Sequence, residues 1–279
     1  MMRQVILNGR LVEGDPPLMP VDNRAFHYGD GVFETIRVIG GRGQLLEAHW
    51  ARLAASLAVL GIRMPEKLTA ELLDRYVSDL AQRGGGAGGR ARLTVYRDAP
   101  GFYRPDADAG AFTLEYEPLA EMTYTLNEQG VMVDIYPDMR KPVNQLAVHK
   151  TLNALLYVMA SLWAKGRGLD DCLLQNDRGN IIESSSGNLF MVSNSVLYTP
   201  ALTDGCVGGV MRMRVINLAL AGGIKVYECS LNPQNLLAAD EVFFTNAARG
   251  ITWAAAYRTK RYTQRMAQRI TAMLVEGVS

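Results

Sequence analysis

The sequence predicts an α+β fold in two domains. Segments with strand character and segments with apolar residues at helical spacing alternate along the chain without an internal repeat. The stretch Glu117–Tyr124 follows a predicted strand and indicates a linker between two halves. We therefore expect a smaller N-terminal α/β domain over residues 1–118, a linker over 119–125 and a larger C-terminal domain over 126–279, with a cleft between the domains.

The N-terminal half is expected to hold strands around two helices. The dipeptide Asn8-Gly9 predicts a tight hairpin turn. Between Glu47 and Leu60 apolar residues recur at helical spacing, and Gly61 supplies a stop signal. The other expected elements are strands at Gln4–Leu7, Arg10–Val12 and Gly31–Val38, a helix at about Leu68–Arg83, and strands at Arg90–Arg97 and Ala111–Tyr116.

A glycine-rich run from Gly84 to Gly89 could be mistaken for a phosphate-binding loop. It lacks the following Lys-Ser/Thr of such loops, and a predicted strand follows it instead of a helix. A flexible connector is therefore the favoured interpretation.

The C-terminal half is expected to contain three helices and several strands. A helix over Thr151–Lys165 would carry its apolar residues on one face, namely Leu152, Leu155, Leu156, Met159, Leu162 and Trp163. The other expected elements are a strand at Val131–Tyr136, a hairpin of Cys172–Gln175 and Asn180–Glu183, strands at Leu189–Val192, Val196–Tyr198 and Glu241–Thr245, and helices at Val210–Leu220 and Thr263–Val275.

Composition indicates an ordinary globular protein. The chain has 279 residues, 48% hydrophobic content and a formal charge of +1. A net charge so close to zero does not indicate nucleic acid or an anionic membrane as a partner. Its three cysteines have no Cys-x-x-Cys spacing, so a disulfide framework or a zinc site is not expected, and no metal partner is visible for the three histidines. No apolar stretch approaches the ~18 residues of a membrane span. We expect a cytoplasmic protein.

Lys150 and Glu183 supply the two groups that an aldehyde cofactor needs. An amine forms an imine, and an anion keeps a pyridine nitrogen protonated so that the ring takes up electrons. A lysine before the helix expected at 151–165 faces the positive end of the helix dipole, at a cost of about 0.5 kcal/mol, and an amine tied up as an imine avoids this cost. Small polar residues after Glu183 leave room for a planar ring. A solvated lysine and a polar turn are the alternatives.

The run Gly205–Arg212 predicts an anion site. Gly208 and Gly209 lie at the start of a predicted helix, where N–H groups without obstructing side chains bind phosphate. Arg52, on the polar side of its own helix, would add a charged contact to the same phosphate. With the amine and the carboxylate above, these features describe one cofactor site.

Six segments along the chain carry a resemblance. They are Asn23-Arg-Ala-Phe-His-Tyr-Gly-Asp-Gly-Val-Phe-Glu-Thr35, His49-x-x-Arg52-Leu53, Lys150-x-Leu-Asn153, Glu183-x-x-Ser-Gly-Asn188-Leu-Phe, Gly209-Val-Met-Arg212 and Asp240-Glu-Val-Phe-Phe-Thr-Asn246. On these motifs, in this order, the chain resembles the fold-type IV pyridoxal-phosphate enzymes, the class IV aminotransferase family, over nearly its whole length.

The resemblance implies a two-domain fold like that of D-amino-acid aminotransferases and pyridoxal 5′-phosphate as cofactor. It implies that Lys150 is the Schiff-base lysine and proton carrier and that Glu183 pairs with the pyridine nitrogen. Arg52 and the backbone at Val210 and Met211 would hold the phosphate. The further cofactor-binding residues that it implies are Asn188, Gly209 and Asn246.

The motif details favour one reaction of the family. Aminotransferases carry a hydroxyl where this chain has Met211, and Ser/Thr pairs where it has Asn246-Ala247. Thr35 falls where lyases place a hydroxyl near the substrate, so Thr35 joins Lys150 as a catalytic candidate. The resemblance thus favours an aminodeoxychorismate lyase of folate biosynthesis that forms 4-aminobenzoate and pyruvate. The alternatives are an aminotransferase of the D-amino-acid or branched-chain type and a cofactor-binding protein with vestigial activity.

Substrate contacts and subunit contacts are expected from overlapping segments of the N-terminal half. The candidates for binding a small amino substrate are Tyr28, Arg97, Tyr103 and Arg104, with a plain surface loop over 95–104 as the alternative. The resemblance also implies a homodimer in which each cleft includes a loop of the partner. Phe26–Gly31 and Phe102–Arg104 are the candidate loops.

Overall fold

The chain forms two compact units. The computed structural model describes residues 4–13, 19–86 and 88–277. The first unit runs up to Thr123 and includes His149–Asn153, and the second comprises Tyr124–Val148 and the residues from Ala154 on. The sequence assigned the Lys150 segment to the C-terminal domain. It groups with the first unit because Phe33 N–H donates to the Lys150 carbonyl at 3.0 Å, which adds the segment to the edge of a strand.

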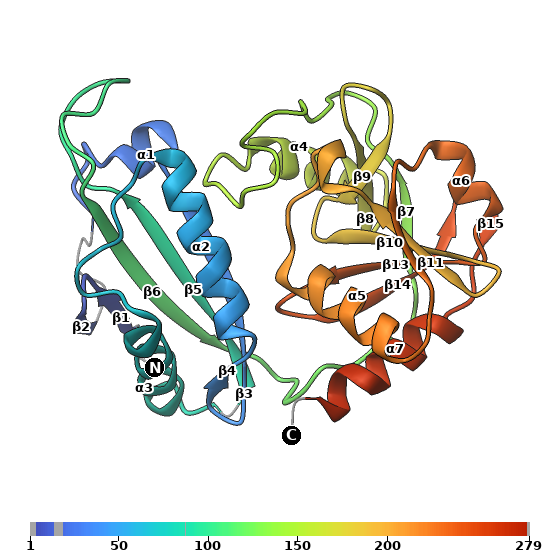
Figure 1. Ribbon diagram of the computed structural model, residues 1–279, viewed down its shortest axis with the longest axis horizontal. Coiled ribbons are helices and arrows are strands. Elements are labelled where there is room, and N and C mark those ends of the chain that lie inside the picture. Colours follow the sequence, from blue (N-terminus) through green and yellow to red (C-terminus); the bar gives the residue numbers. More distant parts are fainter. Residues whose placement is uncertain (1–3, 14–18, 87, 278–279) are drawn as a thin grey trace. The chain divides into compact units, whose positions relative to one another are not determined.

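The first unit is an antiparallel sheet with helices on one face (Figure 1). The strand order is β2-β1-β6-β5-β3-β4. The strands are β1 (Gln4–Leu7), β2 (Arg10–Glu13), β3 (Gly31–Ile39), β4 (Arg42–Gly43), β5 (Gly88–Arg97) and β6 (Gly110–Pro118), and the helices are α1 (Arg24–Tyr28), α2 (Leu46–Leu60) and α3 (Ala70–Arg83). Alternate residues of β3, such as Val32 and Ile36, pack against Leu53 and Leu57 of α2 in a buried core.

The glycine-rich run belongs to the packing of the first unit. Gly88 and Gly89 begin β5, and residue 87 lies outside the described part of the chain. A Cβ on Gly89 would lie 2.4 Å from the Tyr116 hydroxyl, which donates to the carbonyl of Gly86 at 2.9 Å. The glycines are therefore needed where the ring of Tyr116 crosses the backbone.

The second unit is built on a mixed nine-stranded sheet. The strand order is β12-β11-β10-β13-β14-β7-β8-β9, β15 pairs with β14, and β9 also pairs with β10 through Glu183 and Asn188. The elements are β7 (Val131–Ile135), α4 (Leu155–Gly166), β8 (Asp171–Gln175), β9 (Ile181–Ser184), β10 (Asn188–Ser193), β11 (Val196–Pro200), η1 (Leu202–Asp204), α5 (Val210–Ala221), β12 (Val226–Cys229), α6 (Pro233–Ala238), β13 (Glu241–Asn246), β14 (Gly250–Tyr257), β15 (Lys260–Arg261) and α7 (Arg265–Glu276). The pairing of β9 with β10 closes a ring of strands at two of the predicted site residues.

Helix α4 corrects two expectations from the sequence. It begins at Leu155 and not at residue 151, because residues 150–152 are extended beside β3, so Lys150 does not face a helix dipole. The expected apolar face is also only partly buried, because Leu156 and Trp163 pack against the core while other residues of that face do not. Leu155 is 66% exposed and Leu162 is 56% exposed, whereas the small residues Ala160 and Ala164 are buried. None of the helices in the described ranges combines the length and apolar character of a membrane span.

Candidate active site

Glu183 is a buried carboxylate near the end of β9, and its position is set by three donors. Its Oε1 atom accepts hydrogen bonds from Lys141 Nζ and the Tyr157 hydroxyl, both at 2.7 Å. Its Oε2 atom accepts one from the Val207 N–H at 2.8 Å. Burial, and then the charge of Glu183, raise the pKa of Tyr157, so the phenol stays protonated and donates. Lys141 and Tyr157 were not singled out from the sequence.

The first turn of α5 offers backbone donors to an anion. Its N-cap residue is Gly209, no side chain caps the helix, and no acidic residue lies in the first turn. A Cβ on Gly209 would collide with Asn188 Oδ1, so any other residue at this position would displace the Asn188 amide. Met211 is 1% exposed and brings no polar side-chain group. An anion at this helix terminus would be held by the backbone at Val210 and Met211.

Asn188 connects the carboxylate to the start of α5. It is the register partner of Glu183, and its Nδ2 donates to the Val207 carbonyl at 2.7 Å. Asn246, at the end of the neighbouring β13, donates through Nδ2 to the Ser186 carbonyl at 3.2 Å. The second unit therefore brings together Glu183, Asn188 and the α5 turn, while the Asn246 side chain secures an adjacent turn.

Lys150 lies at the polar face of the N-terminal sheet, a surface that we define by Phe33, Thr35, Arg92 and Thr94. The Lys150 ammonium is 4.3 Å from the centroid of the Phe33 ring. Thr35 is two residues further along β3 and therefore shares this face with Phe33. Arg92 is the register partner of Thr35, and its guanidinium carbon is 3.9 Å from the same centroid. Lys150 and Arg92 thus both lie at the Phe33 ring, on the sheet face that also carries Thr35.

Arg92 was missed in the sequence, although a signal was present. Along β5 the buried residues Ala91 and Leu93 alternate with Arg92 and Thr94, which places both polar residues away from the core. Burial lowers the pKa of Arg92, since the half-buried guanidinium has lost part of its hydration. The charge of Glu115, the register partner of Arg92 on β6, offsets part of that loss, and an anionic ligand would add to this effect.

Arg52 is held by Glu34 on the other face of β3. Arg52 Nε donates to Glu34 Oε1 at 2.8 Å, and Arg52 Nη2 bonds to Oε2. His49 Nδ1 lies 2.6 Å from the same Oε2 atom. Burial raises the pKa of Glu34, but the hydrogen bonds from Arg52 and His49 outweigh it and leave the pKa lowered. Glu34, unnoticed in the sequence, therefore orients the arginine that we predict to contact the phosphate.

The lowered pKa of Glu34 predicts a loss of stability in acid. Because the pKa is lower in the folded than in the unfolded chain, the stabilisation is present above the unfolded pKa and is lost as the pH falls through the folded one. Glu34→Gln should cost about 1–3 kcal/mol at pH 7 and flatten the decline in stability below pH ~4.5. Urea unfolding from pH 7 into the acid range measures the free energy of unfolding of each variant. Glu66→Gln, at an exposed position, is the control. If the stability of wild type and of Glu34→Gln declined in parallel with falling pH, Glu34 would not be the source of the acid sensitivity.

The candidate substrate residues all lie in the first unit, but they differ in burial and in hydrogen bonding. Arg97 is 7% exposed, and its Nε donates to Asp30 at 2.9 Å while Nη1 and Nη2 donate to carbonyls at the end of α2. This arrangement gives Arg97 a structural role. Tyr103 is 90% exposed, and its ring lies 5.4 Å from that of Tyr28. Arg104 follows on the same exposed loop.

Comparison with known proteins gives the family. A solved branched-chain aminotransferase from Thermoproteus uzoniensis, with norvaline, superposes with a TM-score of 0.89 at 28% identity, over 98% of this chain and 94% of that chain. The family model described as amino-transferase class IV matches residues 31–257. The chain belongs to the class IV aminotransferase family.

Relatives within the family carry different activities in their names. A Methanocaldococcus jannaschii protein, provisionally named a branched-chain-amino-acid aminotransferase, is 32% identical over 89% of this chain and 85% of its own length. A D-alanine aminotransferase of Bacillus licheniformis is 30% identical over 87% and 84%. An aminodeoxychorismate lyase of Vibrio harveyi is 28% identical over 84% and 85%. The chain is therefore similar to both transferases and lyases.

Proposed function

We propose that this chain is a pyridoxal-phosphate-dependent lyase that converts aminodeoxychorismate to 4-aminobenzoate and pyruvate. The observation that carries the proposal is the placement of Thr35 on the same sheet face as Phe33, whose ring the Lys150 ammonium contacts at 4.3 Å. An amine and a hydroxyl at one face provide a base and a separate proton donor. The buried Met211, in a position where transferases carry a hydroxyl, agrees with this choice.

The residues fit pyridoxal phosphate as the cofactor. When bound, it supplies an electron sink for the electron pair released next to an amine-bearing carbon. Glu183, fixed by three hydrogen bonds, would accept the ring N–H. The uncapped start of α5 suits the phosphate, with Arg52 as the charged contact. Lys150 supplies the amine.

The roles of the residues follow from the bonds that change. Lys150 removes a ring proton of the substrate and holds it on its Nζ atom. The C–O bond to the enolpyruvyl group breaks, and the ring becomes aromatic. The enolpyruvate takes up one proton, donated with the help of the Thr35 hydroxyl, and leaves as pyruvate. No amino group is stored between turnovers, so no 2-oxo acid is required.

The test is to supply each substrate class separately to the purified, pyridoxal-phosphate-loaded enzyme. We expect pyruvate and 4-aminobenzoate from aminodeoxychorismate with no oxo acid present. D-Alanine or L-leucine with 2-oxoglutarate should give little turnover. Conversion of the cofactor to its amine form by a simple amino acid, without lysis of aminodeoxychorismate, would overturn the lyase proposal.

An aminotransferase of the D-amino-acid or branched-chain type is the second candidate. The names of two relatives at 30% identity or more favour it. It would use Lys150 and Glu183 in the same way, so the substrate assay above separates the two candidates. A protein that binds the cofactor with vestigial activity would give no product from either substrate class.

Arg92 is our candidate for binding a substrate carboxylate. It lies in register with Thr35 and is half-buried beside Phe33, where a charge-assisted hydrogen bond to a carboxylate is stronger than in water. Arg92→Met should raise KM by roughly 10- to 100-fold, which corresponds to about 1.5–3 kcal/mol for a charged hydrogen bond. Arg90→Met, an exposed neighbour on the same face, is the control. Equal KM values for both variants would exclude the role.

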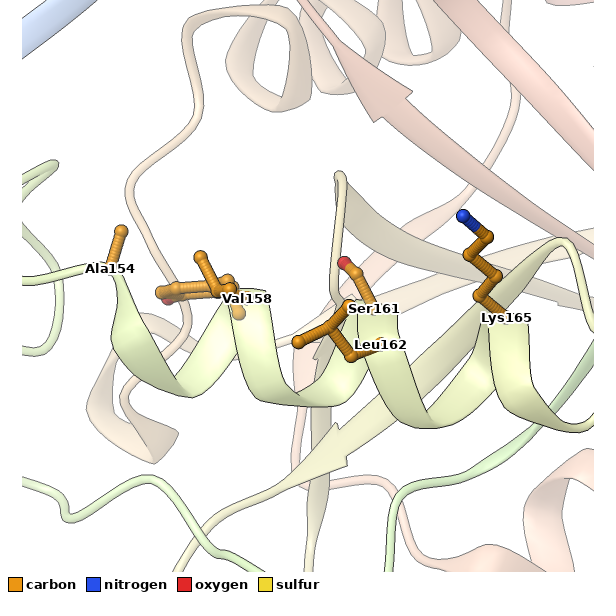
Figure 2. Close-up of a pocket in the computed structure, with 6 residues that line it drawn as sticks. Ala154, Val158, Ser161, Leu162 and Lys165 are labelled. Atoms are coloured by element: carbon orange, nitrogen blue, oxygen red, sulfur yellow. The ribbon is translucent and has the colours of Figure 1, made fainter.

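We also propose that two copies of the chain associate through α4. Figure 2 shows side chains of α4 that line a pocket, among them Val158, Ser161 and Leu162. The large apolar residues that α4 exposes are Leu155, Val158, Met159 and Leu162. A stripe of four large exposed apolar side chains on one helix indicates a protein–protein interface. The exposed Phe26 and the Phe102–Arg104 loop remain the candidates for completing a partner's site.

A charge placed in this stripe should weaken the dimer. Leu162→Glu would bury a carboxylate without a partner in the interface. We therefore expect the dissociation constant of the dimer to rise at least about 10-fold. Light scattering or sedimentation over a concentration series measures it. Leu220→Glu, an equally exposed leucine on α5, serves as the control because it lies outside the stripe. A wild-type monomer at every concentration would refute the proposal.

The cysteines agree with a cytoplasmic enzyme, which we also propose. All three are free thiols, and Cys172 and Cys206 are buried. Burial, and then the nearby Glu183 charge, raise the pKa of Cys206 to about 12, so its thiol is unreactive at neutral pH.

A further inference from the structure

Lys141 forms a buried ion pair with Glu183 that the mechanism above does not use. Lys141 is 8% exposed and Glu183 is 3% exposed. The Lys141 ammonium donates to Glu183 Oε1 at 2.7 Å and to the Ala147 carbonyl at 2.8 Å. The backbone of Lys141 is itself fixed, because its N–H donates to the Gln175 carbonyl at 2.9 Å on β8. The cation therefore has one defined position beside the carboxylate.

The hydrogen bonds to Glu183 leave one acceptor position of its carboxylate unfilled among the described residues. Each carboxylate oxygen accepts about two hydrogen bonds. Oε1 is filled by Lys141 and Tyr157, whereas Oε2 accepts one bond, from Val207, among the described residues. One acceptor position therefore remains, and it is on Oε2. A ring N–H is a single donor and matches that position.

We propose that Lys141 is a positioning residue that balances the charge of the Glu183 carboxylate and directs its Oε2 atom to the pyridine nitrogen of pyridoxal phosphate. This rests on the proposed function. A buried carboxylate without a counter-charge bears the full cost of desolvation. The phenol of Tyr157 donates a hydrogen bond but supplies no positive charge, so Lys141 alone balances Glu183 within this cluster.

A structural role for Lys141 predicts different behaviour. If Lys141 served only to hold the Ala147 carbonyl, the charge at position 183 would not matter to its replacement. If it balances Glu183, neutralising the carboxylate should offset the loss of the lysine. The interaction is therefore tested by coupling between the two positions.

The experiment compares the full chain carrying K141M, K141R, E183Q and K141M/E183Q with wild type. Pyridoxal phosphate is titrated by absorbance and fluorescence, and urea unfolding is followed without it at neutral pH. We expect K141M to weaken pyridoxal-phosphate binding at least 10-fold and K141R to retain most of it. The unfolding midpoint of K141M should fall below those of wild type and K141R, because the buried carboxylate loses its counter-charge. K141M/E183Q should recover much of the midpoint lost in K141M.

Each failure has a distinct meaning. Without recovery in K141M/E183Q, Lys141 does not balance Glu183. Recovery together with unchanged pyridoxal-phosphate affinity in K141M leaves an ion pair with no bearing on the cofactor, and this too overturns the proposal. Equal losses in K141M and K141R would show that shape and not charge matters. A wild-type chain that binds no pyridoxal phosphate would refute the proposed function itself, while the unfolding data would still report on the ion pair.

Discussion

Lys150→Ala should abolish turnover and remove the visible absorbance of pyridoxal phosphate joined to the protein. In both candidate reactions we propose that this lysine supplies the covalent attachment and the proton transfer, so kcat should fall by roughly three orders of magnitude or more. The fold should survive, since the Lys150 segment is held to β3 by backbone hydrogen bonds that alanine also makes. Absorbance spectra and substrate turnover measure the two effects.

A matched control for Lys150→Ala is Lys225→Ala, an exposed lysine before β12. It should leave the spectrum and the rate unchanged. A Lys150→Ala variant that kept the absorbance of protein-joined cofactor would show that another amine makes the attachment. The assignment of Lys150 would then be wrong, although the family membership would stand.

Glu241→Ala should cause the largest loss of stability that we expect from one side chain. Glu241 is buried at the start of β13, and its carboxylate accepts hydrogen bonds from Met266 N–H at 2.9 Å and Ala267 N–H at 3.2 Å. The N-cap residue of α7, Gln264, makes no capping bond through its side chain. Glu241 therefore caps α7 from a distance and also offsets the positive end of the helix dipole.

Removing the Glu241 carboxylate leaves buried N–H groups without an acceptor, so we expect a loss of about 3 kcal/mol. Urea or thermal unfolding measures it. The exposed Glu66→Ala should change stability by no more than about 0.5 kcal/mol. A loss in Glu241→Ala as small as that of the control would mean that water replaces the carboxylate, and α7 would not depend on its remote cap.

Elements with strong local patterns were predicted well from the sequence. The helix expected over 47–60 forms as α2, Leu46–Leu60, and the hairpin at Asn8-Gly9 forms as β1 and β2. These segments combine clear periodicity with turn or stop residues that act locally. By contrast, the central strand β14, Gly250–Tyr257, was not predicted. Its three consecutive alanines give no strand signal, and its pairing with β7 and β13 is decided by neighbours far along the chain.

The site residues divide in the same way, into those predictable from their sequence neighbours and those placed by contacts with distant residues. Lys150, Glu183 and the Gly208-Gly209 turn were predicted because each has a recognisable sequence neighbourhood. Lys141 was not, since a lysine before a proline carries no local sign of lying 2.7 Å from a carboxylate 42 residues away. Arg92 also depends on pairing between strands, which sets its place opposite Thr35.

The sequence by itself determined the family and most elements, and it predicted the two groups that pyridoxal-phosphate chemistry needs. Tertiary structure decided the environment of those groups. It changed Lys150 from the start of a helix to an extended segment on β3, because backbone pairing with Gly31 and Phe33 outweighs local helical preference. It also left part of the apolar face of α4 exposed. Leu155 and Leu162 are exposed, whereas Leu156 and Trp163 pack against the cluster that contains the buried Ala160 and Ala164. Periodicity shows that a helix has an apolar stripe, but only packing decides which surface covers it.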